Sequence, residues 1–136
     1  MIIEYSPLSN ALRGNAYKVA IQTCGHFDWS LFQRNLLSGI DLIYFDLKCI
    51  DSYLHQQWTG RSNRRILDNF SRLVNAARHK VVCTIPLIPG YTAQKDNVHD
   101  LARFAGDMDV ISFCLRPYNP GIWFKAREVF FIPTKA

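Results

Sequence analysis

Short apolar runs of strand type alternate with segments of helical periodicity along most of this chain. The runs, rich in Val, Ile, Leu and aromatic residues, predict strands at 17–23, 41–48, 81–88 and 110–116. The intervening segments predict helices at 28–37, 51–58, 63–79 and 96–106. Strands separated by helices connect through right-handed crossovers and form a parallel sheet. The sequence therefore predicts an α/β fold of about four βα units, which is half of a (β/α) barrel or a small open sheet.

Length and composition favour a single domain over residues 1–136. Of these 136 residues, 49% are hydrophobic, which is enough to form one core. The segment 63–79 is the clearest predicted helix, because Ile66, Phe70, Leu73 and Ala77 share one helical face. The tail predicts a further short strand at 128–132, whose partner is not evident from the sequence.

The charge pattern excludes two classes of partner. The net charge is +5, but Lys and Arg are scattered, and the densest basic stretch, 61–65, holds only three arginines. Nucleic-acid-binding domains carry a basic stripe with exposed aromatic residues between the charges, so we expect no nucleic-acid partner. No apolar run reaches membrane-spanning length, and the first residues lack a signal pattern, so we expect no membrane partner and a cytoplasmic location.

The four cysteines do not form a metal-binding pattern. Cys24, Cys49, Cys83 and Cys114 lie far apart, whereas zinc and iron–sulfur sites draw at least two ligands from one tight turn. We expect reduced, largely buried thiols and no metal site.

The predicted strand 41–48 (DLIYFDLK) carries charge on one face. Side chains alternate along a strand, so Tyr44, Asp46 and Lys48 share a face and the residues between them form an apolar face. Strands of a parallel sheet are normally apolar on both faces, and an unpaired buried charge costs several kcal/mol. An internal salt bridge or a solvated strand end would explain these charges. A ligand site explains them better, because sites in α/β folds form at this end of the strands.

Polar residues close the other predicted strands at a similar depth. Gln22 and Thr23 end the first strand, Thr84 lies in the third, and Arg116 and Asn119 close the fourth. Each alone is ordinary strand or turn chemistry. Together they outline a polar rim suited to a small zwitterionic ligand.

Five short motifs resemble those of one enzyme family. In order along the chain they are Gln22–Gly25 (QTCG), Asp46–Lys48 (DLK), Thr59–Asn63 (TGRSN), Ile85–Tyr91 (IPLIPGY) and Pro117–Pro120 (PYNP). Their order and intervals resemble the activating enzymes of pyruvate formate-lyase and related glycyl-radical enzymes, over about residues 17–121. The resemblance implies a partial parallel (β/α) barrel of the radical SAM type.

The resemblance also implies cofactors, a partner and site residues. Members of the family cleave S-adenosylmethionine with a [4Fe-4S] cluster and install a glycyl radical on a partner enzyme. By resemblance, Asp46, Leu47 and Lys48 lie against S-adenosylmethionine, and Asn119 lies on its adenine side. Asp46, Thr23 and the Tyr44 carbonyl are expected to hold a cation beside the carboxylate of S-adenosylmethionine.

Two positions depart from the family pattern, and one motif is missing. Gln22 stands where the family has Asp or Glu, and Thr84 stands where it has Arg. The sequence starts near the family's third strand and contains no CxxxCxxC motif, so this chain alone cannot ligate the cluster and is expected to be inactive.

Two interpretations follow from these departures. The first is a truncated or partial activase, which could be a truncated gene product, an expressed fragment or one half of a split enzyme. The second is a non-catalytic binding module that keeps the partner-loop or small-ligand surface. In both cases, a half barrel exposes sheet edges through which we expect self-association.

Overall fold

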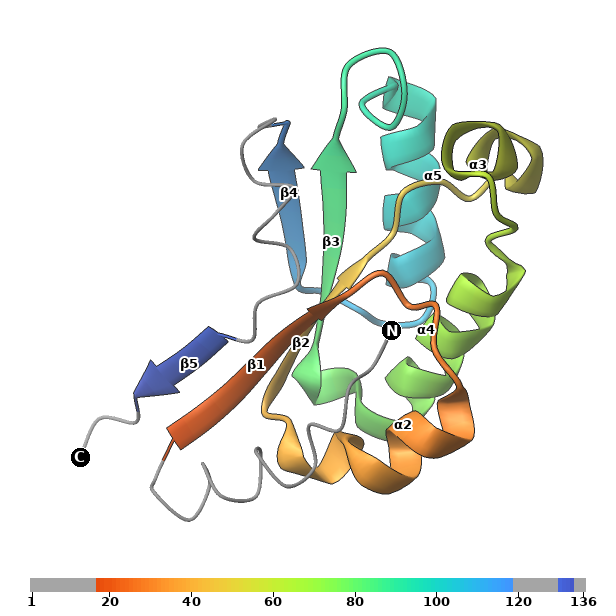
Figure 1. Cartoon of the computed structure of the whole chain (residues 1–136). Coiled ribbons are helices and arrows are strands. Elements are labelled where there is room, and N and C mark those ends of the chain that lie inside the picture. Colours follow the sequence, from red (N-terminus) through yellow and green to blue (C-terminus); the bar gives the residue numbers. More distant parts are fainter. Residues whose placement is uncertain (1–16, 119–129, 134–136) are drawn as a thin grey trace.

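The fold is built on a five-stranded sheet. The computed structural model describes residues 17–118 and 130–133. The strands are β1 (Tyr17–Thr23), β2 (Leu42–Asp46), β3 (Val81–Leu87), β4 (Phe113–Pro117) and β5 (Phe130–Pro133). Their order in the sheet is β4-β3-β2-β1-β5 (Figure 1). The strands β1 to β4 are parallel, as predicted. The tail strand β5 pairs antiparallel with β1, which is the partner that the sequence left open.

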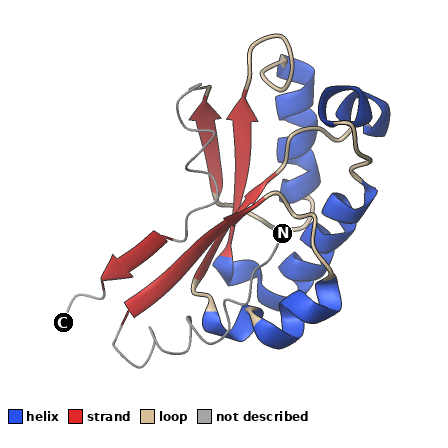
Figure 2. Cartoon of the chain, viewed as in Figure 1, coloured by secondary structure: helices blue, strands red, loops and turns tan. Residues whose placement is uncertain are grey.

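The described helices cover one face of this sheet (Figure 2). They are α2 (Trp29–Asn35), α3 (Ser52–Thr59), α4 (Arg64–Ala77) and α5 (Lys95–Gly106), with short 3-10 turns η1 (Leu37–Gly39) and η2 (Arg78–Lys80). Each predicted helix is present with ends shifted by a few residues. Parallel strands with helices on one side give the arc of a partial barrel, in which the opposite face of the sheet is the inner face.

Local capping explains where the short helices begin and end. The Asp28 carboxylate accepts a hydrogen bond from the Leu31 N–H at 3.0 Å, and Asp51 accepts one from Leu54 at 2.9 Å. Each aspartate thereby satisfies a backbone donor that the first turn leaves free. Gly60 ends α3 in the left-handed conformation (φ 76°), which glycine adopts without strain.

The core lies between the sheet and the helices. Ile43, Phe45 and Leu47 are at most 1% exposed, and Phe70 and Leu73 of α4 pack into the same cluster. The apolar face of the predicted strand 41–48 is therefore the core face, as the alternation predicts. Tyr44 and Asp46 alternate with these core residues along the strand and therefore lie on the inner face.

The fourth strand is less complete than the sequence suggests. It begins at Phe113 instead of Val110, and Ile111 just before it is 90% exposed. Phe113 and Leu115 remain 41% and 52% exposed, because β4 is an edge strand that the described helices do not cover.

Within the described residues, no helix is long and apolar enough to cross a membrane.

Candidate ligand site on the inner face of the sheet

The strand register brings polar residues together on the inner face. Gln22 of β1 is paired in register with Tyr44 of β2. Asp46 is paired with Thr84 of β3, which in turn is paired with Cys114 of β4. Residues paired in register point to the same side of a sheet. Strands far apart in the sequence therefore present their polar side chains to one surface.

A chain of hydrogen bonds crosses this surface. Arg116 Nη1 donates to Gln22 Oε1 at 2.8 Å, and Gln22 Nε2 donates to both carboxylate oxygens of Asp46 at 3.2 and 3.1 Å. A guanidinium only donates, so the Gln22 oxygen must face Arg116 and its NH₂ group must face Asp46. The amide is thus fixed between a positive and a negative group.

The contact between Arg116 and Gln22 joins strands that are not neighbours. Two strands, β3 and β2, lie between β4 and β1, which makes about 14 Å in a flat sheet. The guanidinium carbon lies 5.3 Å from the centre of the Tyr44 ring on β2, within the range of a cation–π interaction. Arg116 therefore bridges the inner face above Tyr44 and ties the outer parallel strands together.

Burial raises the pKa of the Asp46 carboxyl above its ordinary value of 3.8, because removal from water disfavours the charged carboxylate. The hydrogen bond from Gln22 and the positive charges of Lys48 and Arg116 act in the opposite direction. Burial is the larger effect.

Thr84 supplies an unused polar atom beside this carboxylate. Its side chain is fully buried, and its Oγ1 has no hydrogen-bond partner among the described residues. A buried hydroxyl without a partner costs about 1–3 kcal/mol and is uncommon in folded proteins, so Thr84 is an unusual feature of this part of the sheet. Because Thr84 is paired in register with Asp46, this place adjoins the carboxylate.

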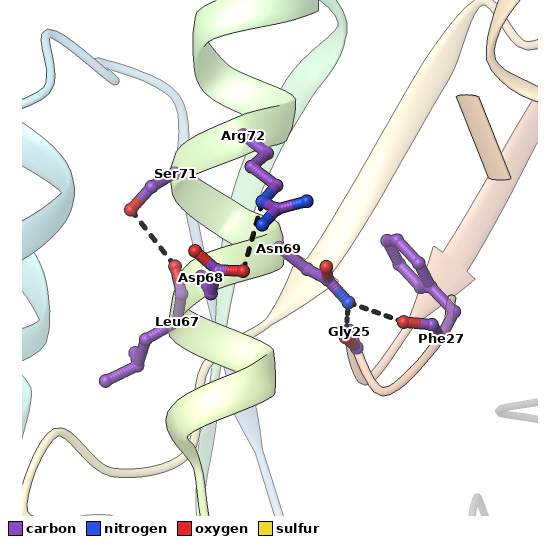
Figure 3. Close-up of polar contacts among 7 residues, drawn as sticks. All are labelled: Gly25, Phe27, Leu67, Asp68, Asn69, Ser71 and Arg72. Atoms are coloured by element: carbon purple, nitrogen blue, oxygen red, sulfur yellow. Dashed lines mark hydrogen bonds and ion pairs between the residues drawn. The ribbon is translucent and has the colours of Figure 1, made fainter. Parts of the chain in front are cut away.

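Three buried asparagines hold the loops that leave the carboxyl ends of the strands. Asn69 donates to the carbonyls of Gly25 and Phe27, both at 2.8 Å, and fixes the turn after β1 (Figure 3). Asn63 donates to the carbonyls of Cys49 and Ile50 after β2, at 3.0 and 2.8 Å.

The third of these asparagines acts on the end of the DLK segment. Asn97 of α5 donates to the Lys48 carbonyl at 2.8 Å and to the Thr92 carbonyl at 3.0 Å. Buried backbone carbonyls need such partners, so these amides determine where the strands end and where the site begins.

The structure distributes the predicted site residues over both faces. Asp46 and Lys48 are half-buried at the end of β2, and their charges interact. The Leu47 side chain is buried in the core, so only its backbone adjoins the inner face; its N–H donates to the Thr84 carbonyl at 2.8 Å. Thr23 is paired in register with Phe45, a core-face residue, and its hydroxyl accepts from the Gly25 N–H at 3.0 Å. Asn119 lies outside the described residues.

Sequence reasoning placed Gln22 and Arg116 on a rim but missed their contact. Nothing in the sequence links residues 94 positions apart on separate strands. Once β1 and β2 are aligned, Gln22 and Tyr44 lie opposite each other and point to the same face of the sheet. That shared face is the part of the contact that could have been predicted.

The described residues do not fit an iron–sulfur cluster. Cys49 and Cys83 are buried, Cys24 is exposed and Cys114 is intermediate. Within residues 17–118 and 130–133, no three His, Cys, Asp or Glu side chains lie close enough to hold a metal ion. Burial also raises the pKa of Cys83 to about 12, which keeps that thiol protonated.

Comparison with known proteins identifies relatives of one kind. No family model matches the chain. It is 31% identical to the isethionate sulfite-lyase activating enzyme of Oleidesulfovibrio alaskensis, over 74% of this chain and 32% of the relative. It is 34% identical to the indoleacetate decarboxylase activating enzyme of Tractidigestivibacter scatoligenes, over 76% of this chain and 33% of the relative. It is 36% identical to the pyruvate formate-lyase-activating enzyme of Staphylococcus aureus, over 68% of this chain and 38% of the relative.

The fold has a counterpart among solved structures. A domain of the pyruvate-formate lyase-activating enzyme of Bacteroides vulgatus matches 85% of this chain and 71% of that domain's chain, with a TM-score of 0.72 and 23% identity. The chain spans about a third of the length of the curated relatives it matches. Its homologues by sequence are glycyl-radical enzyme activating enzymes, matched over about three quarters of this chain.

Proposed function

We propose that this chain forms the S-adenosylmethionine-facing part of a glycyl-radical enzyme activating enzyme. The observation that carries the proposal is the polar surface at the ends of the parallel strands, where Asp46, Gln22 and Arg116 are linked beside the free Thr84 hydroxyl. The homology supports the same assignment, because the relatives are activating enzymes.

The residues of this surface fit a zwitterionic ligand. Lys48 and Arg116, both partly exposed, offer positive charge to a carboxylate. Asp46 offers a negative charge near the sulfonium and amine of the ligand. Asn119 is the proposed adenine-side residue. The partner of the complete enzyme would be a glycyl-radical enzyme.

Cleavage of S-adenosylmethionine in this family needs an electron from a [4Fe-4S] cluster. Because the described cysteines do not fit such a cluster, the cluster would have to come from another segment or chain. We therefore propose that residues 1–136 are inactive alone and act as a partial activase. The expected cytoplasmic location stays a prediction.

A non-catalytic binding module is the second candidate, and it agrees equally well with described cysteines that fit no cluster. Such a module would bind S-adenosylmethionine or a partner loop through the same inner face without redox chemistry.

Ligand binding tests the part common to both candidates. S-adenosylmethionine is titrated into the labelled chain while amide and side-chain NMR signals are followed. We expect saturable shifts at Asp46, Lys48 and Thr84, and about tenfold weaker binding of Lys48→Gln, a loss of about 1.4 kcal/mol. Lys95→Gln, which changes an exposed lysine on α5, is the matched control. Shifts confined to other surfaces would refute the proposed site.

Complementation separates the two candidates. The chain is mixed, under reducing conditions without oxygen, with a segment that carries a CxxxCxxC motif. Formation of 5′-deoxyadenosine and methionine that depends on this chain supports the partial activase. A reconstituted cluster segment that binds the chain but yields no cleavage supports the binding module instead.

A further inference from the structure

The inner face provides its own counter-charge for Asp46. Gln22 Nε2 donates to both Asp46 oxygens, and Arg116 holds the other end of the amide at 2.8 Å. The linked group contains one carboxylate, one guanidinium and one neutral amide, so its net charge is zero.

These contacts conflict with the cation site that the resemblance implies. A metal cation needs several oxygen atoms that converge on one point with free lone pairs. Here the side chain at position 22 presents N–H groups, and not oxygen, to Asp46. Thr23 does not supply the missing oxygen, because it is paired with the core-face residue Phe45 and therefore points to the other face of the sheet from Asp46. The donor set therefore does not fit a metal cation.

The source of positive charge has also moved between strands. Position 84, where the resemblance expects an arginine, carries a short threonine on β3. The guanidinium comes instead from β4, where Arg116 is paired in register with Pro86. It reaches Asp46 indirectly, through Gln22 of β1.

We propose that Gln22 and Arg116 together take the place of a bound cation at Asp46, so that this chain holds its carboxylate without a metal ion. Gln22 acts as the donor that contacts the carboxylate, and Arg116 orients and polarises it. The proposal concerns a part of the site assigned above. It is tested by cation binding and not by S-adenosylmethionine, so either proposal can fail alone.

The test uses the full chain, labelled with ¹⁵N and ¹³C, at constant pH. The Asp46 carboxyl carbon and the Gln22 side-chain NH₂ signals are followed while N-methylglucamine is replaced by sodium or potassium at constant ionic strength. We expect no saturable shift of either signal. A saturable shift of both, with either metal ion, would overturn the proposal.

A double variant, Gln22→Glu with Arg116→Gln, provides the positive control. It places a second carboxylate beside Asp46 and removes the guanidinium, so cation binding should tighten at least about tenfold. If the double variant is folded by its backbone spectrum and still ignores both metal ions, Gln22 and Arg116 are not what excludes the cation, and the proposal fails. If it does not fold, the single variant Gln22→Glu replaces it with the same two outcomes.

Discussion

Arg116 and Gln22 are hydrogen-bonded at 2.8 Å although they lie on β4 and β1, with two strands between them. The contact crosses the inner face above Tyr44 and ends at the Asp46 carboxylate. It combines two tasks: it links the outer parallel strands, and it supplies charge to the residue on which the proposed ligand site depends.

Removing Arg116 should make ionisation of Asp46 less favourable. Burial already raises the pKa of Asp46, and Arg116 is one of the groups that oppose this rise, so Arg116→Gln should raise that pKa further. An acid with a raised pKa in the folded state stabilises the protein below its unfolded pKa and loses that contribution as the pH rises through the folded pKa. The variant should therefore lose more stability than the wild type between pH 4 and pH 7.

Urea denaturation at both pH values, with NMR titration of the Asp46 carboxyl, measures this effect. Arg103→Gln on the exposed side of α5 is the matched control, and Asp46→Asn should abolish the difference. An unchanged Asp46 titration in Arg116→Gln would contradict the prediction.

Gly25→Ala should be strongly destabilising. A Cβ at this position would overlap Cζ of the Phe45 ring, and Gly25 has a positive φ of 80°. Phe45 is fully buried and cannot move aside without disturbing the core, so we expect a loss of about 3 kcal/mol or more. Gly60→Ala isolates the backbone cost, because Gly60 has a similar φ of 76° with nothing within 4 Å. That control should lose only about 1 kcal/mol in thermal or urea unfolding. Equal losses would show that the ring contact is not the cause.

Asn69→Ala should release the turn after β1. The substitution leaves the carbonyls of Gly25 and Phe27 without their donor and should cost about 2–3 kcal/mol of unfolding free energy. Asn75→Ala, an exposed position on the same helix, should be neutral or slightly stabilising because alanine favours helix. Hydrogen exchange of residues 23–28 should accelerate in Asn69→Ala alone. Unchanged exchange there would argue against the positioning role.

The thiols should differ widely in reactivity. Cys24 is exposed, whereas Cys83 is fully buried with a pKa of about 12. At about pH 8, the thiolate fraction of Cys83 is on the order of 10⁻⁴, so iodoacetamide should modify Cys24 first and Cys83 only on unfolding. The Cys83 contribution to stability should be complete below its ordinary pKa of 9.0 and decline toward pH 12. Mass spectrometry of timed samples gives the order, and early modification of Cys83 would refute it.

The exposed edge at β4 should promote self-association. Phe113 and Leu115 of the edge strand β4 are half-exposed. Exposed apolar edge strands tend to pair with other chains. Replacing both with threonine keeps strand propensity and should shift sedimentation toward monomer. Leu31→Gln, which removes an apolar side chain that is 56% exposed on α2, should not. A wild-type chain that stays monomeric at about 100 μM would contradict the expectation.

The sequence by itself determined the elements and the two faces of β2. Apolar runs and helical stripes specify strands and helices locally, and the aspartate caps of α2 and α3 act within a single turn. The same local alternation assigned Asp46 to the polar face and Phe45 to the core, because side-chain direction in a strand depends only on parity.

Tertiary structure decided which of these residues meet. Three interactions join segments far apart in the sequence. They are the Arg116–Gln22 contact, the hydrogen bonds from Asn69 to the turn after β1, and the antiparallel pairing of β5 with β1. The order of the strands and the pairs of residues that face each other depend on contacts between segments far apart in the sequence, which a pattern within one strand does not specify. For the same physical reason, the position of Thr23 opposite Phe45, on the other face from Asp46, appeared only once β1 and β2 were aligned.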